Sequence, residues 1–127
     1  MILIDTNIAI DLRDGSAVAN ARVAALMQRP VLSQITRIEL EAGVFRQPEL
    51  AGARRRVLDV LVERFPVIAL IDDDVLAYGR IIAACGFDRR KMLDRLIAAQ
   101  AIARNATLAT ANAVDFADIP NLKLIAW

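Results

Sequence analysis

The sequence contains no histidine. This absence excludes a Ser-His-Asp triad, a Cys-His pair and any imidazole metal ligand. Cys85 is the only cysteine, so the chain has no disulfide framework and no paired thiolates. The lone thiol fits a reducing compartment, and we expect a cytoplasmic protein. Any catalysis must therefore depend on carboxylates, hydroxyls, amides and a hard metal ion.

Long hydrophobic runs are also missing, although 57% of the residues are hydrophobic. The apolar run over residues 67–71 is among the longest, and a membrane span needs roughly 18 such residues. We therefore expect no membrane-spanning segment. The surplus of apolar residues is assigned to a core and to a protein–protein interface.

Charge of either sign is not in excess, because the formal net charge is only +1. Global basicity therefore gives no argument for nucleic-acid binding. Local basic clusters occur at residues 54–56 and at residues 89–91 with Arg95. Clusters of this kind are more often solvated helix or loop surface than binding sites.

Short apolar runs alternate with longer segments of helical periodicity along the whole chain. Strands are expected at residues 2–4, 31–33, 67–70, 107–110 and 122–125. Helices are expected at residues 8–12, 17–28, 35–45, 49–64, 72–84 and 93–104. This alternation predicts an α/β fold, with a parallel sheet and helices on both faces, in one domain over residues 1–127.

Acids occur near the expected strand ends and in the helices that follow them: Asp5, Glu39, Asp94 and Asp115. Asp5 could be only a helix N-cap, and a negative charge in the first helical turn, as at Asp94, is favoured by the helix dipole. However, residues 96–103 are apolar nearly all round, which is typical of a buried helix. An acid at the mouth of a buried helix needs a partner, because an unpaired buried carboxylate is costly.

Two acids compete on the helix expected over residues 35–45. Its apolar stripe consists of Ile35, Ile38, Ala42 and Phe45. Glu39 and Glu41 flank that stripe at similar angles, so periodicity does not say which of them points inward.

The other acids considered, a run of three and a single residue, have simpler explanations. The run over residues 72–74 is interpreted as helix capping, and Asp118 as a solvated loop acid.

Four gathered carboxylates would repel one another, and they coexist in the ionised form only with a cation among them. Oxygen-only ligands without histidine or paired cysteine select Mg²⁺ or Mn²⁺. Sites of this kind activate a water molecule and stabilise phosphoryl oxygens.

Four segments of the sequence resemble, in order, the motifs of the PIN-domain nucleases. They are the opening MILIDTN, the segment SQITRIEL over residues 33–40, the segment LDRLIAAQA over residues 93–101 and the segment LATANAVDF over residues 108–116. The resemblance extends from residue 1 to residue 127. The subgroup that the sequence most resembles is the VapC toxins of type II toxin–antitoxin pairs.

The resemblance implies a five-stranded parallel sheet with a metal site made by Asp5, Glu39 and Asp94. It favours Glu39 over Glu41. The fourth acid is assigned to Asp115, with Asn112 as a polar helper. Supporting polar groups around the acids are assigned to Thr6, Asn7 and Thr110. We expect Thr6 and Asn7, rather than Asp5, to cap the first helix.

The resemblance also implies an Mg²⁺- or Mn²⁺-dependent endoribonuclease, a homodimer and a cognate antitoxin that blocks the site. Asp5 and Asp94 would bind the metal directly, whereas Glu39 and Asp115 would act through water. Contacts to RNA are expected from the basic residues Arg89, Arg90, Lys91 and Arg95. The alternatives are an inactive PIN-like binding module and a housekeeping RNA-processing nuclease without an antitoxin. A phospho-acceptor domain is disfavoured, because neither lysine of the chain follows the expected fourth strand.

Overall fold

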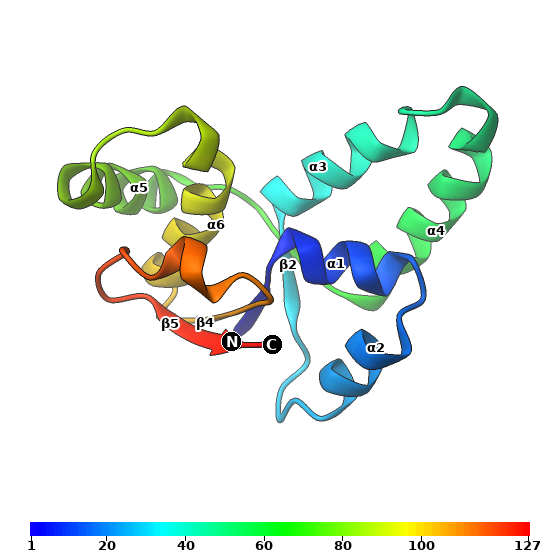
Figure 1. Cartoon of the computed structure of the whole chain (residues 1–127), viewed down its shortest axis with the longest axis horizontal. Helices are drawn as coiled ribbons and strands as arrows, with labels where there is room; N and C mark the ends of the chain where they lie inside the picture. The colour runs from blue at the N-terminus through cyan, green and yellow to red at the C-terminus, as the bar shows by residue number, and fades with distance from the viewer.

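Five parallel strands form one sheet in the order β3-β2-β1-β4-β5 (Figure 1). The computed structural model describes all residues from 1 to 127. The strands are β1 (Ile2–Ile4), β2 (Val31–Ser33), β3 (Val67–Ile68), β4 (Thr107–Thr110) and β5 (Lys123–Ala126). The predicted α/β class and parallel sheet are confirmed. The carboxyl ends of all five strands share one edge of the sheet, where α/β proteins place ligand chemistry.

Helices cover both faces of the sheet. They are α1 (Thr6–Arg13), α2 (Ala17–Ala24), α3 (Gln34–Val44), α4 (Ala51–Arg64), α5 (Asp72–Cys85) and α6 (Met92–Ala103). Successive strand residues point to opposite faces, so Ile4 packs with α1, α2 and α4 while Leu3 packs with α5 and α6. Three short 3₁₀ turns complete the chain: η1 (Pro48–Leu50), η2 (Arg89–Lys91) and η3 (Ala113–Phe116). None of the helices has the length and apolar character that crossing a membrane requires.

Several helix boundaries differ from the sequence prediction. Helix α1 begins at Thr6, because Asp5 itself is the N-cap and its side chain accepts a hydrogen bond from the Thr6 amide. The expectation that Thr6 and Asn7 cap this helix is therefore wrong. Helix α2 stops at Ala24, four residues short of the predicted end, because the chain then turns to enter β2. The other helix and strand ends shift by no more than two residues, within the fraying expected of such boundaries.

The apolar stripe predicted on α3 does not face the core. Only Ile35 of that stripe is buried, whereas Ile38 is 57% and Phe45 is 67% exposed. The buried face of the helix instead carries Leu40 and Val44, which join the core beside α1 and α4. The reason is that α3 projects away from the sheet after its first turn and packs mainly against α4 (Figure 1).

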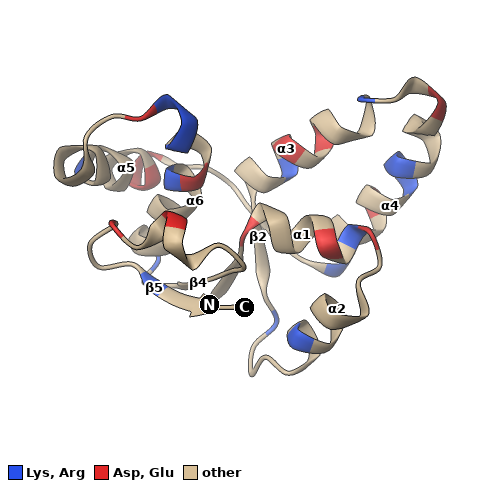
Figure 2. Cartoon of the chain, viewed as in Figure 1, with Lys and Arg blue, Asp and Glu red and all other residues tan.

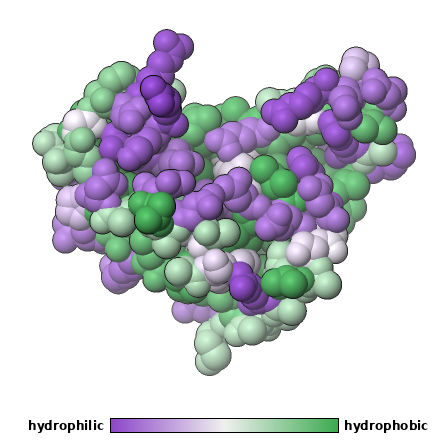
Figure 3. Space-filling view, in the orientation of Figure 1, coloured by the Kyte–Doolittle hydropathy of each residue, from purple (hydrophilic) through white to green (hydrophobic).

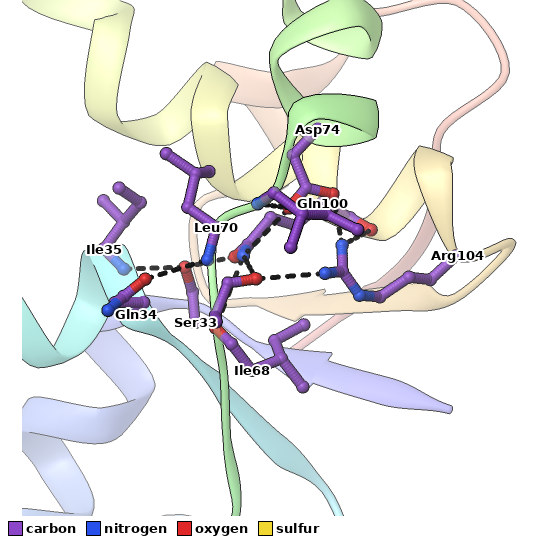
Figure 4. A network of polar contacts seen from close by, with 10 residues as sticks. Ser33, Gln34, Ile35, Ile68, Leu70, Asp74, Gln100 and Arg104 are labelled. Atoms are coloured by element: carbon purple, nitrogen blue, oxygen red, sulfur yellow. Dashed lines mark hydrogen bonds and ion pairs between the residues drawn. The ribbon is translucent and has the colours of Figure 1, made fainter.

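A buried polar network joins α6 to the segments around β2 and β3 (Figure 4). The Gln100 amide group donates to the Ala69 carbonyl at 3.2 Å and to the Asp74 carboxylate at 3.5 Å, and its oxygen accepts from the Ser33 hydroxyl. Asp74 is fully buried, forms an ion pair with Arg104 and accepts from the Ile71 amide at 2.9 Å. The capping interpretation of residues 72–74 therefore holds for Asp74, which also anchors α6.

Candidate active site

Asp5 lies at the carboxyl end of β1 and is only 3% exposed. One of its carboxylate oxygens accepts from the Thr6 amide at 2.7 Å, and the other accepts from the Thr110 hydroxyl at 2.8 Å. Its own amide donates to the Ala109 carbonyl at 2.9 Å, which joins it to β4. These contacts fix the carboxylate, yet an ionised carboxylate has about four acceptor positions. Asp5 therefore retains free lone pairs for a ligand.

Hydroxyl groups extend this arrangement on both sides of Asp5. The Thr110 hydroxyl accepts from the Asn112 amide at 3.0 Å, which orders the turn before η3. The Thr6 and Thr36 hydroxyls are 3.0 Å apart and hydrogen-bonded. Thr36 is fully buried on α3, one turn before Glu39. Thr36 is not among the residues predicted for the site from the sequence, although its spacing of three residues from Glu39 places both on one helix face.

The four predicted acids interact electrostatically around Asp5. The pKa of Asp94 is raised to about 6. Burial is the largest cause, and the negative charges of Asp5, Glu39 and Asp115 also contribute. Burial also raises the pKa of Glu39, with a contribution from the Asp5 charge, while the Thr6 hydroxyl opposes the shift. The pKa of Asp5 is raised by its burial, although the hydrogen bonds from Thr110 and Thr6 lower it. The fold thus brings together acids that are far apart in the sequence.

Glu41 lies outside this group. It forms an ion pair with Arg55 of α4, and the hydrogen bond from that arginine lowers the pKa of its carboxyl. Of the two acids that periodicity left open, only Glu39 is coupled to Asp5 and Asp94. The polar helpers differ in placement too: Thr6 and Thr110 are buried beside Asp5, whereas Asn7 and Asn112 are exposed.

The donor set fits a hard divalent cation. All four groups are carboxylates, which repel one another, and no basic side chain is among the causes of the pKa shifts of Asp5, Glu39 and Asp94. As the side chains stand, no three of them are close enough to hold one ion together. Chelation would therefore require the side chains of the half-buried Glu39 and Asp94 and of the exposed Asp115 to rotate toward a common point.

The basic residues proposed for RNA contact divide into two kinds. Arg89 and Arg90 are exposed and Lys91 is partly exposed in turn η2, directly before the helix that carries Asp94. Arg95 is only 4% exposed, and its guanidinium donates to the Gly86 carbonyl at 2.7 Å. The assignment of Arg95 to RNA contact is therefore wrong, because its charged group points into the protein. Asp118 is not a purely solvated acid, since it accepts from Arg95 at 3.4 Å.

Comparison with known proteins shows the family to which the chain belongs. The chain matches the PIN domain family over residues 2–122. It is 31% identical to Ribonuclease VapC2 of Rickettsia felis over 132 aligned positions, covering 98% of this chain and 96% of the relative. The fold, with its carboxylate-lined strand edge, and this similarity show that the chain belongs to the PIN-domain family, in its VapC group.

Solved structures give the same result. The crystal structure of VapBC2 from Rickettsia felis bound to a promoter DNA fragment superposes with a TM-score of 0.86 and 29% identity, covering 100% of this chain and 99% of that one. VapBC-1 from nontypeable Haemophilus influenzae superposes with a TM-score of 0.82 and 30% identity, covering 100% and 98%. The similarity therefore spans the whole fold, including every strand end that carries an acid.

We expect Asp94→Asn to stabilise the metal-free protein at neutral pH. The pKa of Asp94 rises from an ordinary 3.8 to about 6 in the folded protein, so the folded state holds this proton more tightly than the unfolded chain does. Stability of the wild type must then fall as the pH rises through this range. Because solvent screens a half-buried group, the expected gain at pH 7.5 is about 1 kcal/mol, or about 4 °C in Tm.

Thermal unfolding in EDTA at pH 7.5 and pH 4.5 checks this expectation. The gain should shrink at the lower pH, where the wild-type Asp94 is protonated. Glu41→Gln is the matched control and should not stabilise the protein, because its ion pair with Arg55 lowers the pKa of Glu41. A lower Tm for Asp94→Asn than for the wild type at pH 7.5 would contradict the expectation.

Proposed function

We propose that the protein is a metal-dependent endoribonuclease and the toxin of a toxin–antitoxin pair. The observation that supports this most strongly is the coupling of Asp94 to Asp5, Glu39 and Asp115, without a basic side chain to balance them. Such a group needs a cation when it is ionised. Mg²⁺ or Mn²⁺ bound there would lower the pKa of a water molecule and offset charge on phosphoryl oxygens.

The chain's own residues divide the work as follows. Asp5, fixed by Thr6 and Thr110, and Asp94, in the first turn of α6, would hold the metal ion. Glu39 and Asp115 would orient the attacking water molecule. The raised pKa of Glu39 brings this carboxylate nearer to the operating pH, which suits a group that accepts a proton. In-line hydrolysis would leave a 5′-phosphate and a 3′-hydroxyl, without a histidine or the ribose 2′-hydroxyl.

Cleavage of a mixed-sequence RNA should require Mg²⁺ or Mn²⁺ and stop in EDTA. Asp5→Asn should reduce kcat by on the order of 100-fold or more, because it removes a direct ligand while keeping the N-cap oxygen. The control Glu41→Gln should remain active, because Glu41 of α3 pairs with Arg55 and not with the acids of the site. Product ends identified by mass spectrometry should carry the 5′-phosphate.

Full activity in EDTA, or in Asp5→Asn, would contradict the metal–carboxylate mechanism. Calorimetric titration with Mn²⁺ distinguishes the nuclease from an inactive PIN-like binding module, because a module without catalysis should bind the ion poorly. A housekeeping nuclease would show the same cleavage but no antitoxin complex.

Turn η2 is proposed as a contact to the RNA backbone. Its basic residues are the exposed Arg89 and Arg90 and the partly exposed Lys91. They lie directly before α6, on one of the two projections that flank a central notch (Figures 2 and 3). Both projections carry hydrophilic residues around the notch in this view (Figure 3). A flexible backbone bearing phosphates would meet this charge on its way to the acids.

Replacing Arg89, Arg90 and Lys91 together by Ala should raise the KM for RNA and leave kcat nearly unchanged. Because each neutralised phosphate of a single strand contributes about 0.7 to the salt dependence, the slope of log K against log salt should fall by about 2. Fluorescence anisotropy at several salt concentrations measures that slope. Arg80→Ala on the exposed surface of α5 is the control; an equal effect there would show that only net charge matters.

Two apolar surfaces support the proposed protein partners. A groove of about 270 Å³ between α1 and α4 has a floor of Leu12, Val57, Val60 and Leu61 and a rim of Arg13, Arg56 and Arg64. An acidic amphipathic segment fits this composition, and we assign it to the antitoxin.

The exposed apolar residues of α3 and α5, among them Phe45 and Leu76, are assigned to a homodimer. The unpaired Cys85 thiol is compatible with the cytoplasm.

Light scattering can test both surfaces in one experiment. The chain alone should have twice its 13.9 kDa mass. It should form a larger complex when it is co-expressed with the proposed cognate antitoxin. Val60→Glu should abolish that complex and leave the dimer, whereas Leu76→Glu should produce a monomer. If Val60→Glu still forms the complex at wild-type yield, the groove is not the antitoxin site.

A further inference from the structure

Arg95 is buried next to the acidic site, but it does not serve that site as a counter-ion. It follows Asp94 directly on α6, and its side chain is only 5% exposed. Neighbouring helix positions point about 100° apart, so the two side chains diverge. No arginine is among the causes of the Asp94 pKa shift, which come from burial and from other acids. The guanidinium of Arg95 is directed away from Asp94, toward Gly86 and Asp118.

The Arg95 guanidinium joins three segments of the chain. One terminal nitrogen donates to the Gly86 carbonyl at 2.7 Å, just after the end of α5. The other donates to the Asp118 carboxylate at 3.4 Å, after turn η3. The Cys85 thiol also donates to the Asp118 carbonyl at 3.2 Å. The first turn of α6, the end of α5 and the segment after η3 are thus fastened together at one point.

Two of these segments carry acids of the site. Asp94 is adjacent to Arg95 on α6. Asp115 lies in turn η3, three residues before Asp118, which follows that turn. A contact between Arg95 and Asp118 therefore restrains the separation of the Asp94 and Asp115 backbones. The restraint is costly in itself, since the Arg95 Nε is buried without a hydrogen-bond partner.

We propose that Arg95 is a positioning residue whose contacts with Asp118 and Gly86 hold the backbone segments of Asp94 and Asp115 in place, so that both side chains can turn toward a shared divalent cation. This inference rests on the proposed metal site. It makes Asp118 part of the same device, although Asp118 does not face the acids. It also explains why the basic residue at position 95 is buried and not available for contact with RNA.

The test is calorimetric titration of the full-length protein with Mn²⁺. Asp118→Asn removes the charge of a half-exposed residue and should weaken Mn²⁺ affinity by about 10-fold, the lower end of the range for groups that orient metal ligands. Arg95→Met should weaken it at least as much. Arg95→Lys should restore only part of it, because an ammonium cannot span Gly86 and Asp118 as a guanidinium fork does.

Asp14→Asn provides a matched control. Asp14 also pairs with an arginine, Arg13 at 2.9 Å, and is also well exposed, but it lies at the end of α1 away from the acids. Its Mn²⁺ affinity should equal that of the wild type. In RNA cleavage, Asp118→Asn and Arg95→Met should lower kcat at limiting Mn²⁺ and leave the KM for RNA unchanged.

The outcomes distinguish the two proposals. If the wild type binds Mn²⁺ and Asp118→Asn binds it equally well, the positioning role is wrong while the metal site stands. If Arg95→Met raises the KM for RNA and Asp118→Asn does not, Arg95 acts on the substrate and the positioning role is again wrong. If the wild type itself binds no Mn²⁺, the proposed metal site and this inference both fail. Should Arg95→Met not fold, Asp118→Asn alone decides.

Discussion

The burial of the Asp5 carboxylate is the constraint on which the rest of the structure depends. A carboxylate that is 3% exposed must be compensated, and here a backbone amide and a threonine hydroxyl provide part of the compensation. The remainder is not supplied by any arginine. Instead, the fold brings Glu39, Asp94 and Asp115 toward Asp5 and raises the pKa of Asp94. This arrangement is unfavourable without a cation, so it links the stability of the protein to its function.

Such an arrangement requires a rigid frame, and α6 is fastened at two levels. Around Gln100, hydrogen bonds reach Ser33 at the start of α3 and Asp74 at the start of α5 (Figure 4). In its first turn, Arg95 reaches the segments on either side. Asp94 belongs to the same first turn of α6 as Arg95. Repulsion among the acids therefore acts on a helix that cannot easily move away, which keeps the site assembled.

The apolar residues that do not enter the core have a distinct distribution. Helices α3 and α4 form an arm beyond the sheet, and this arm exposes Ile38, Phe45 and Val60 (Figure 1). Such exposed faces, together with the core, account for the high hydrophobic content of the chain. These exposed apolar residues lie on the flanks of the helices, whereas Asp5 lies at the carboxyl edge of the sheet.

The sequence by itself determined the class of the fold and the strand positions, and it named the acids that are candidates for the site. Short apolar runs between turn residues locate buried strands, and a chain without histidine leaves only carboxylates for this chemistry. Tertiary packing alone decided the direction in which several side chains point. Periodicity places Glu39 and Glu41 symmetrically, and only the neighbouring Arg55 and Asp5 distinguish them. In the same way, Arg95 is basic in the sequence but structural in the fold, because its partners come from segments distant in the chain.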